Sequence, residues 1–169
     1  EYRIYRTYNV ETVYNALMKR GATLCLETLD IIIRSNGKPK SIPQEELIAA
    51  DATLHHAPKI FKETCEIDWH QPARSIYNFV RGLSPYPGAW TTMVSPDGRE
   101  TVMKIYQAAE TEKPVNVAVG SIVIEEKHLY VATKDRLLRI IELQLAGKKR
   151  MAAADFLNGM KKIEGYSVK

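Results

Sequence analysis

The sequence has few cysteines and histidines and no long apolar run, and each shortage excludes a class of protein. Its 169 residues include two cysteines and four histidines, none at the spacing of a CxxC or Cys/His metal motif. A disulfide framework and a structural zinc site are therefore not indicated, and Cys25 and Cys65 are expected to be free thiols in a reducing cytoplasm. No apolar run approaches the roughly 20 residues that cross a bilayer.

What the sequence does have is the balance of a globular protein and an uneven distribution of charge. Hydrophobic residues make up 45% and charged residues 26% of the chain. Residues 1–50 carry a net charge of +1 and residues 51–73 a net charge of −2. Residues 74–169 hold fifteen basic and ten acidic side chains, a net charge of +5. This positive C-terminal part suits a polyanionic partner.

The first 50 residues predict one short strand and one long helix. Residues 1–4 have the pattern of a strand, and residues 10–34 repeat apolar side chains at helical spacing. Gly21 is expected to bend or divide this helix, and Asn36-Gly37 to end it. So much apolar surface needs a sheet to pack against, and one short strand does not supply it. The sequence is therefore expected to be a truncated piece of a larger protein.

A proline-punctuated connector follows and leads into a β-rich part. Prolines break residues 38–73, and residues 72–83 then predict a helix with Ile76, Tyr77, Val80 and Leu83 on one face. Five strands are expected after it, joined mainly by short polar turns. Five short antiparallel strands favour an OB-like barrel. The expected strands are residues 89–94, 101–108, 119–124, 128–133 and 137–145, and a last helix is expected over residues 152–158.

Several segments together resemble the methionyl-tRNA formyltransferase family over nearly the whole chain. The connector contributes Pro43-Gln44-Glu45, Ala57-Pro58-Lys59-Ile60 and Ile67-Asp68-Trp69. The start of the β-rich part contributes Ser84-Pro85-Tyr86-Pro87-Gly88-Ala89-Trp90. The most specific segments are Gly147-Lys148-Lys149-Arg150-Met151 and Ala153-Ala154-Asp155-Phe156-Leu157-Asn158-Gly159.

The resemblance implies an α+β fold in three parts and an enzyme whose chemistry lies elsewhere. Residues 1–48 would be a strand-helix remnant of an α/β (Rossmann-like) formyltransferase domain, residues 49–73 a connector, and residues 74–169 an OB-like tRNA-binding domain. The parent enzyme, expected to be monomeric and cytoplasmic, would transfer a formyl group from 10-formyltetrahydrofolate to methionine on initiator Met-tRNA. The family's catalytic asparagine, histidine and aspartate would lie upstream of Glu1. No catalytic residue is assigned here, and this chain alone is expected to be inactive.

The run Lys148-Lys149-Arg150 is the leading candidate for contact with tRNA. Three adjacent cations repel one another, and against a phosphate backbone they release condensed counterions. The alternative is a solvated loop that aids solubility. Further candidates for the same basic surface, in decreasing order, are Arg136, Arg139, Lys161 and Lys162, then Lys104 and Arg81.

The aromatic and histidine residues receive structural interpretations. Trp69 and Trp90 are expected to anchor the connector and the start of the barrel in the core instead of stacking on bases, with Asp68 as a helix cap. The pair His55-His56 has no carboxylate or cysteine at ligand spacing, so no metal site is expected.

Two other functions stay open from the sequence. The chain could be a free-standing nucleic-acid-binding module, or the C-terminal part of a formyltransferase-fold enzyme that acts on another substrate. The segments around Gly147–Met151 and Ala153–Gly159 argue against the second.

Overall fold

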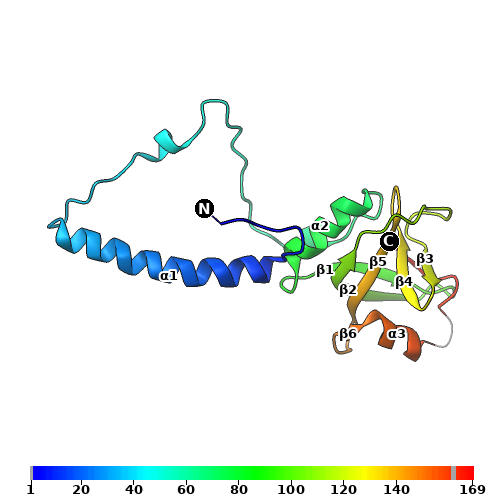
Figure 1. Cartoon of the computed structure of the whole chain (residues 1–169). Coiled ribbons are helices and arrows are strands. Elements are labelled where there is room, and N and C mark those ends of the chain that lie inside the picture. Colours follow the sequence, from blue (N-terminus) through cyan, green and yellow to red (C-terminus); the bar gives the residue numbers. More distant parts are fainter. Residues whose placement is uncertain (1, 161–162) are drawn as a thin grey trace. The chain divides into compact units, whose positions relative to one another are not determined.

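The computed structural model describes residues 2–160 and 163–169, which form two compact units. One unit joins the residues up to Glu11 with Phe61–Lys169, and the other is Thr12–Ile60. Figure 1 shows a mixed α and β chain with α1 (Val10–Arg34), α2 (Ala73–Leu83) and α3 (Ala153–Gly159). Two 3-10 turns, Gln44–Leu47 and Glu63–Cys65, lie in the connector.

Helix α1 is one uninterrupted helix, so the predicted division at Gly21 is wrong. A single glycine inside a helix costs only about 1 kcal/mol relative to alanine, and the 25-residue helix continues through it. None of its described residues is buried. The predicted end is confirmed, because Asn36 and Gly37 adopt φ of 50° and 76° and the Gly37 amide donates to the Ile32 carbonyl at 2.9 Å.

The strand predicted for residues 1–4 is not formed by the part of it that the structure describes. Tyr2 to Ile4 have no regular secondary structure. A strand is stable only when its backbone groups pair with a neighbour, and none of the described strands pairs with this segment. The sequence pattern of residues 1–4 alone was therefore not enough to predict a strand.

The sheet is antiparallel and has seven strands among the described residues instead of the five predicted. Its pairing order is β3-β4-β5-β2-β1-β7, with β6 also paired to β5. The two additional strands, β6 and β7, are two residues long, too short for a sequence period. The bounds are β1 Ala89–Val94, β2 Glu100–Ala109, β3 Ile122–Glu125, β4 His128–Ala132, β5 Leu137–Leu145, β6 Met151–Ala152 and β7 Ser167–Val168.

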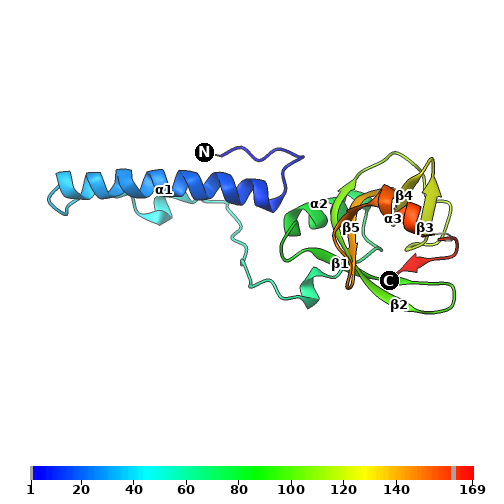
Figure 2. The same ribbon diagram turned by 90° about the horizontal axis from the view of Figure 1, so that it is seen from below.

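The two ends of this pairing order meet at one bridge. Ser121, just before β3, bridges Ser167 of β7, and the Ile122 amide donates to the Tyr166 carbonyl at 3.1 Å. β3 begins later than predicted because Gly120 turns the chain with φ of 81°. A Cβ there would lie 2.4 Å from the Val168 carbonyl oxygen, so this close approach requires glycine. Figure 2 shows β7, in red, near the β1–β2 hairpin.

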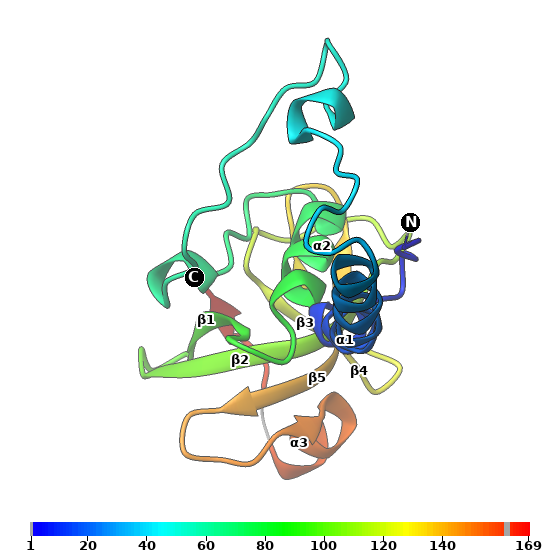
Figure 3. The same ribbon diagram turned by 90° about the vertical axis from the view of Figure 1, so that its left-hand side faces the viewer.

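The core joins buried side chains of the strands with those of α2 and α3. Met103, Ile105 and Leu143 are fully buried. α2 turns Ile76, Val80 and Leu83 inward, as the helical spacing predicts, and Tyr77 is half-buried. α3 contributes Ala153 and Phe156. In Figure 3, α2 and α3 lie on opposite sides of strands β2 and β5.

The tryptophans pack as predicted, but the helix cap is a different residue. Trp69 is 2% exposed and its indole N–H donates to the Thr91 hydroxyl at 2.9 Å. Trp90 packs against the core and donates to the Lys62 carbonyl. The Asp68 carboxylate accepts from the His70 amide and the Gln71 side chain, outside α2. The first amide of α2, that of Ala73, donates instead to Asp135 at 2.8 Å.

Both cysteines are free thiols, Cys25 exposed and Cys65 buried. Within the described ranges, 2–160 and 163–169, no helix has the length and hydropathy needed to span a bilayer. The same residues contain no group of three histidine, cysteine or acidic side chains placed to hold a metal ion.

Candidate nucleic-acid interface

The basic run predicted as the main contact lies on the loop between β5 and β6. The loop covers residues 146–150 and is exposed along its length. Gly147, with φ of 73°, makes the turn, and the Lys148 amide donates to the Leu145 carbonyl at 3.0 Å. A tight turn at the end of a long strand therefore presents the lysines to solvent.

The three cations of this run have different surroundings. Lys148 and Lys149 are exposed, and neither ammonium has a hydrogen bond or ion pair among the residues that the structure describes. Arg150, by contrast, donates from Nε to Glu142 Oε1 at 2.6 Å and from Nη2 to Glu142 Oε2 at 2.5 Å. The hydrogen-bonded Glu142 carboxylate raises the pKa of the Arg150 guanidinium. Two of the three charges are thus free to meet a phosphate, and the third is engaged within the protein.

A polar face on β2 and β5 lies beside the loop. Lys104 of β2 is opposite Gln144 of β5, and the Lys104 ammonium donates to the Pro87 carbonyl at 3.0 Å. The Tyr106 hydroxyl donates to Gln144 Oε1 at 2.7 Å, and the guanidinium carbon of Arg150 lies 4.3 Å from the centre of the Tyr106 ring. Lys104 therefore belongs to the same region as the loop of residues 146–150, called the lysine loop below, although its ammonium already has a partner.

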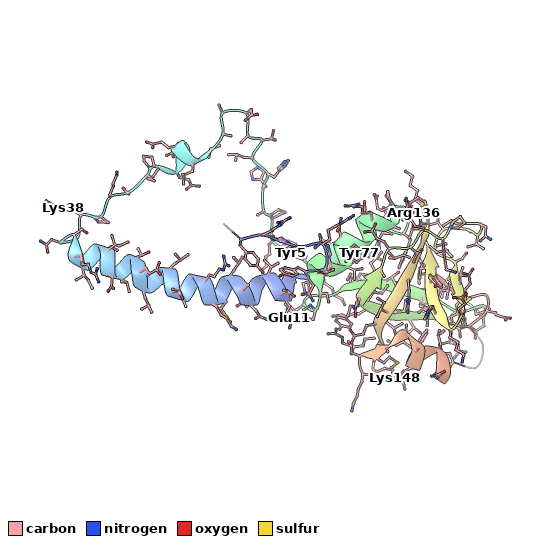
Figure 4. The ribbon with its side chains drawn as sticks, viewed as in Figure 1. Tyr5, Glu11, Lys38, Tyr77, Arg136 and Lys148 are labelled. Carbon is pink, nitrogen blue, oxygen red and sulfur yellow. The ribbon has the colours of Figure 1, made fainter. Side chains whose placement is uncertain are left out.

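Arg136 lies at the other end of β5. It precedes the strand directly, whereas Lys148 follows it, and nine strand residues span about 30 Å. Figure 4 shows the two labelled residues well apart. Arg136 donates to both carboxylate oxygens of Glu112, at 2.8 and 2.7 Å. The structure therefore does not bring Arg136 together with the lysine loop.

The cavity beside Arg136 is electrostatically mixed. It encloses about 570 Å³ and is lined by Arg6, Pro72, Arg74, Glu110, Glu112, Asp135 and Arg136. Three arginines face three carboxylates, so the charges nearly cancel. Such a cavity offers little attraction for a polyanion.

The remaining predicted cations are each held locally or lie outside the described residues. Arg81 donates to the Tyr8 carbonyl at 2.8 Å and to the Asn78 side chain at 2.9 Å. The Arg139 guanidinium lies 3.2 Å from His128 Nδ1. Lys161 and Lys162 are outside the described residues.

Asp135 joins the β4–β5 turn to the start of α2, and its removal should destabilise the unit. The Ala73 amide lowers the pKa of this carboxyl below its ordinary value of 3.8, with Thr133 and Arg136 acting in the same direction. A lowered folded-state pKa contributes stability above the unfolded value, and the contribution disappears as pH falls through the folded value. The variant Asp135→Ala loses the acceptor of the Ala73 amide, and because this carboxylate is well exposed it should lose at most about 1 kcal/mol at pH 7. Its difference from the parent should shrink below pH 3.8.

Urea unfolding at pH 7 and pH 3 measures both effects. Asp135→Asn is the matched control, because it keeps an acceptor oxygen for the Ala73 amide without the charge. It should be less destabilised than the alanine variant. An alanine variant as stable as the parent at pH 7 would show that this contact does not hold the helix.

Sequence reasoning missed the side chains that surround the loop. Glu142, Gln144 and Tyr106 read as ordinary polar positions of strands, because their partners lie on other elements. The one usable signal was the even alternation that places Gln144 on the outer face opposite Lys104. The same alternation places Tyr106 on the face of Lys104, because Met103 and Ile105 are buried and Lys104 and Tyr106 are partly exposed.

Comparison with known proteins supports one family. The C-terminal domain of formyl transferases matches residues 59–161. Methionyl-tRNA formyltransferase of Parabacteroides distasonis is 54% identical over 163 residues, 96% of this chain and 50% of that protein. The protein of the same name from Bacteroides fragilis is 47% identical over 164 residues, again 96% and 50%. The chain thus spans about half the length of the curated relatives it matches.

Solved structures show the same fold at low identity. A variant of HypX from Aquifex aeolicus superposes with a TM-score of 0.56 at 19% identity, covering 92% of this chain and 27% of that one. HypX in complex with tetrahydrofolic acid gives 0.52 at 20% identity, over 79% and 22%. The family match covers more than half of the chain, including β1 to β6 and α3. The chain therefore belongs to the formyl transferase family and carries its C-terminal domain.

Proposed function

We propose that this chain is the tRNA-binding part of a methionyl-tRNA formyltransferase. That enzyme would transfer a formyl group from 10-formyltetrahydrofolate to the methionine amino group of initiator Met-tRNA, in the cytoplasm and as a monomer. The observation that carries the proposal is the 54% identity, over 163 residues, to a protein of that name. The two exposed lysines at positions 148 and 149 support the assignment of tRNA contact to this part of the enzyme.

The proposed division of labour gives this chain binding and no chemistry. Residues 1–48 would be a remnant of the formyltransferase domain, 49–73 a connector and 74–169 the tRNA-binding domain. The sheet would be an OB-like, nearly closed barrel, which the bridge from Ser121 to Ser167 supports. By holding the tRNA body, it would keep the aminoacylated end at the catalytic centre and lower the entropic cost of transfer.

Contact with tRNA would be mainly through phosphates and shape, because A-form grooves hide most base information from side chains. Lys148 and Lys149 would bind phosphate directly, and Lys104 would extend the same surface. The other proposed contacts would be weaker, since their cations already have protein partners. They are Arg136, Arg139 and Arg81, whereas Arg150 would support the surface of Lys148 and Lys149 through its pair with Glu142. Lys161 and Lys162 stay as proposals from the sequence alone.

The proposal predicts salt-dependent binding of tRNA by the 169-residue chain. Each phosphate neutralised by a cation contributes about 0.7–0.9 to the slope of log K against log salt. Filter binding of Met-tRNA at two salt concentrations should therefore give an affinity that falls at the higher one. An affinity independent of salt would contradict the basic contact, and formyl transfer by the purified chain would contradict the division of labour.

A further inference from the structure

The first end of the lysine loop is fastened to β2 through a side-chain relay. Tyr106 lies where the register of β2 against β5 shifts, and such an irregularity re-aims the side chain. Its hydroxyl donates to Gln144 Oε1 at 2.7 Å. The other end of the same amide, Nε2, donates to the Lys148 carbonyl at 2.8 Å. The backbone that carries Lys148 is therefore tied to a half-buried tyrosine.

The second end of the loop is fastened to the same tyrosine. The Arg150 guanidinium lies over the Tyr106 ring, 4.3 Å from its centre, which is cation–π geometry. Both oxygens of Glu142 accept hydrogen bonds from this guanidinium. A bidentate pair of this kind fixes the orientation of the arginine as well as its position. Tyr106 is thus connected to both sides of Lys149, directly to Arg150 and through Gln144 to Lys148.

Arg150 differs from Lys148 and Lys149 in net charge, because an internal carboxylate neutralises it. Glu142 cancels the charge of Arg150, so the net positive charge of the loop is that of Lys148 and Lys149. Exposed lysines on a free loop lose conformational entropy on binding, and a loop held in place loses less. The arrangement is suited to keeping Lys148 and Lys149 in position, because Arg150 anchors the loop to Glu142 and Tyr106.

We propose that Tyr106, Glu142, Gln144 and Arg150 form a clamp that positions the lysine loop for phosphate, and that Arg150 acts as a positioning residue and not as a phosphate ligand. This inference rests on the proposed binding of tRNA. It assigns to four residues of the β2–β5 face a role in affinity that their charges alone do not indicate.

The variant Glu142→Gln tests the clamp because charge and positioning predict opposite results. Loss of an acidic group makes the chain one unit more positive, which by itself strengthens binding to a polyanion. Loss of the clamp releases Arg150 and the loop. It should lower the affinity for tRNA, measured by filter binding, about three- to tenfold. Glu112→Gln is the matched control, since it removes the same charge from the bidentate partner of Arg136, away from the loop. It should bind as tightly as the parent or more tightly.

A second variant keeps the test valid if the first is unstable. Tyr106→Phe removes only the hydroxyl that donates to Gln144 and keeps the ring under Arg150. It should raise amide hydrogen exchange over residues 146–150 and weaken tRNA binding, with an unchanged salt slope because both lysines remain. Tighter binding by Glu142→Gln, or parent-like binding by Tyr106→Phe, would overturn the clamp. Absence of salt-dependent binding in the parent chain would instead overturn the proposed function.

Discussion

Replacement of both Lys148 and Lys149 by glutamine is expected to weaken tRNA binding about ten- to hundredfold at low salt and to flatten the salt slope by about 1.5. The reason is that these are the two ammonium groups of the loop without an internal partner among the described residues, so their whole charge is available to phosphate. Removing them leaves the Lys104 ammonium, which already donates to the Pro87 carbonyl, and the mutually neutralised Arg150–Glu142 pair. Filter binding over a series of salt concentrations measures both the affinity and the slope.

The control for this experiment is the double variant Lys38→Gln and Lys40→Gln. Both side chains are exposed, and they follow α1 in the other compact unit. The variant loses the same two charges from the same chain, so a nonspecific effect of net charge would appear equally in both. Equal loss in the two double variants would contradict a localised contact. Thermal melting of both should match that of the parent, because neither pair supports the core.

Part of this site was predictable because its signal is local. The adjacency of Lys148, Lys149 and Arg150 after a glycine is visible in the sequence and correctly indicated an exposed loop. The difference between the lysines and the arginine was not visible. It depends on Glu142, which lies eight residues earlier in β5, at the position where β5 pairs with Ala152 of β6. The tertiary structure therefore determines that Arg150 has an acidic partner and that the two lysines have none among the described residues.

The same distinction explains the successes and errors in the fold. β1 and α2 follow from periodicity, since alternate residues of β1 are buried and α2 buries residues at helical spacing. The other longer strands were found from the polar turns that separate them, because β4, for example, buries four consecutive residues. The cap of α2 could not be found in this way, because Asp135 lies 62 residues from Ala73. The two-residue strands β6 and β7 are defined only by their partners. Long-range pairing decides these features, and a single sequence carries no local sign of it.

Replacement of Trp69 by alanine is expected to destabilise the β-rich unit by about 3–5 kcal/mol, the largest stability effect of any change considered for this chain. The indole is 2% exposed and lies in one core with Cys65, Ile67 and Ala73, so the end of the connector is part of the folded unit. Its N–H also donates to Thr91, whose hydroxyl in turn donates to the Lys169 carbonyl. Removing the ring leaves a cavity and breaks the first link of this chain of hydrogen bonds.

Thermal melting separates these contributions. Trp69→Phe keeps most of the apolar ring and loses the hydrogen bond to Thr91, so it should cost about 1–3 kcal/mol, less than the alanine variant. Leu54→Ala removes an apolar side chain that is 74% exposed and should change stability by less than about 0.5 kcal/mol. An alanine variant at Trp69 that melts with the parent would mean that the connector does not complete the core. The expected loss is a large share of a total stability of about 5–15 kcal/mol, so tRNA binding should be lost together with the folded state at a lower temperature than in the parent. The two-lysine variant differs in this respect, because it should lose affinity while melting normally.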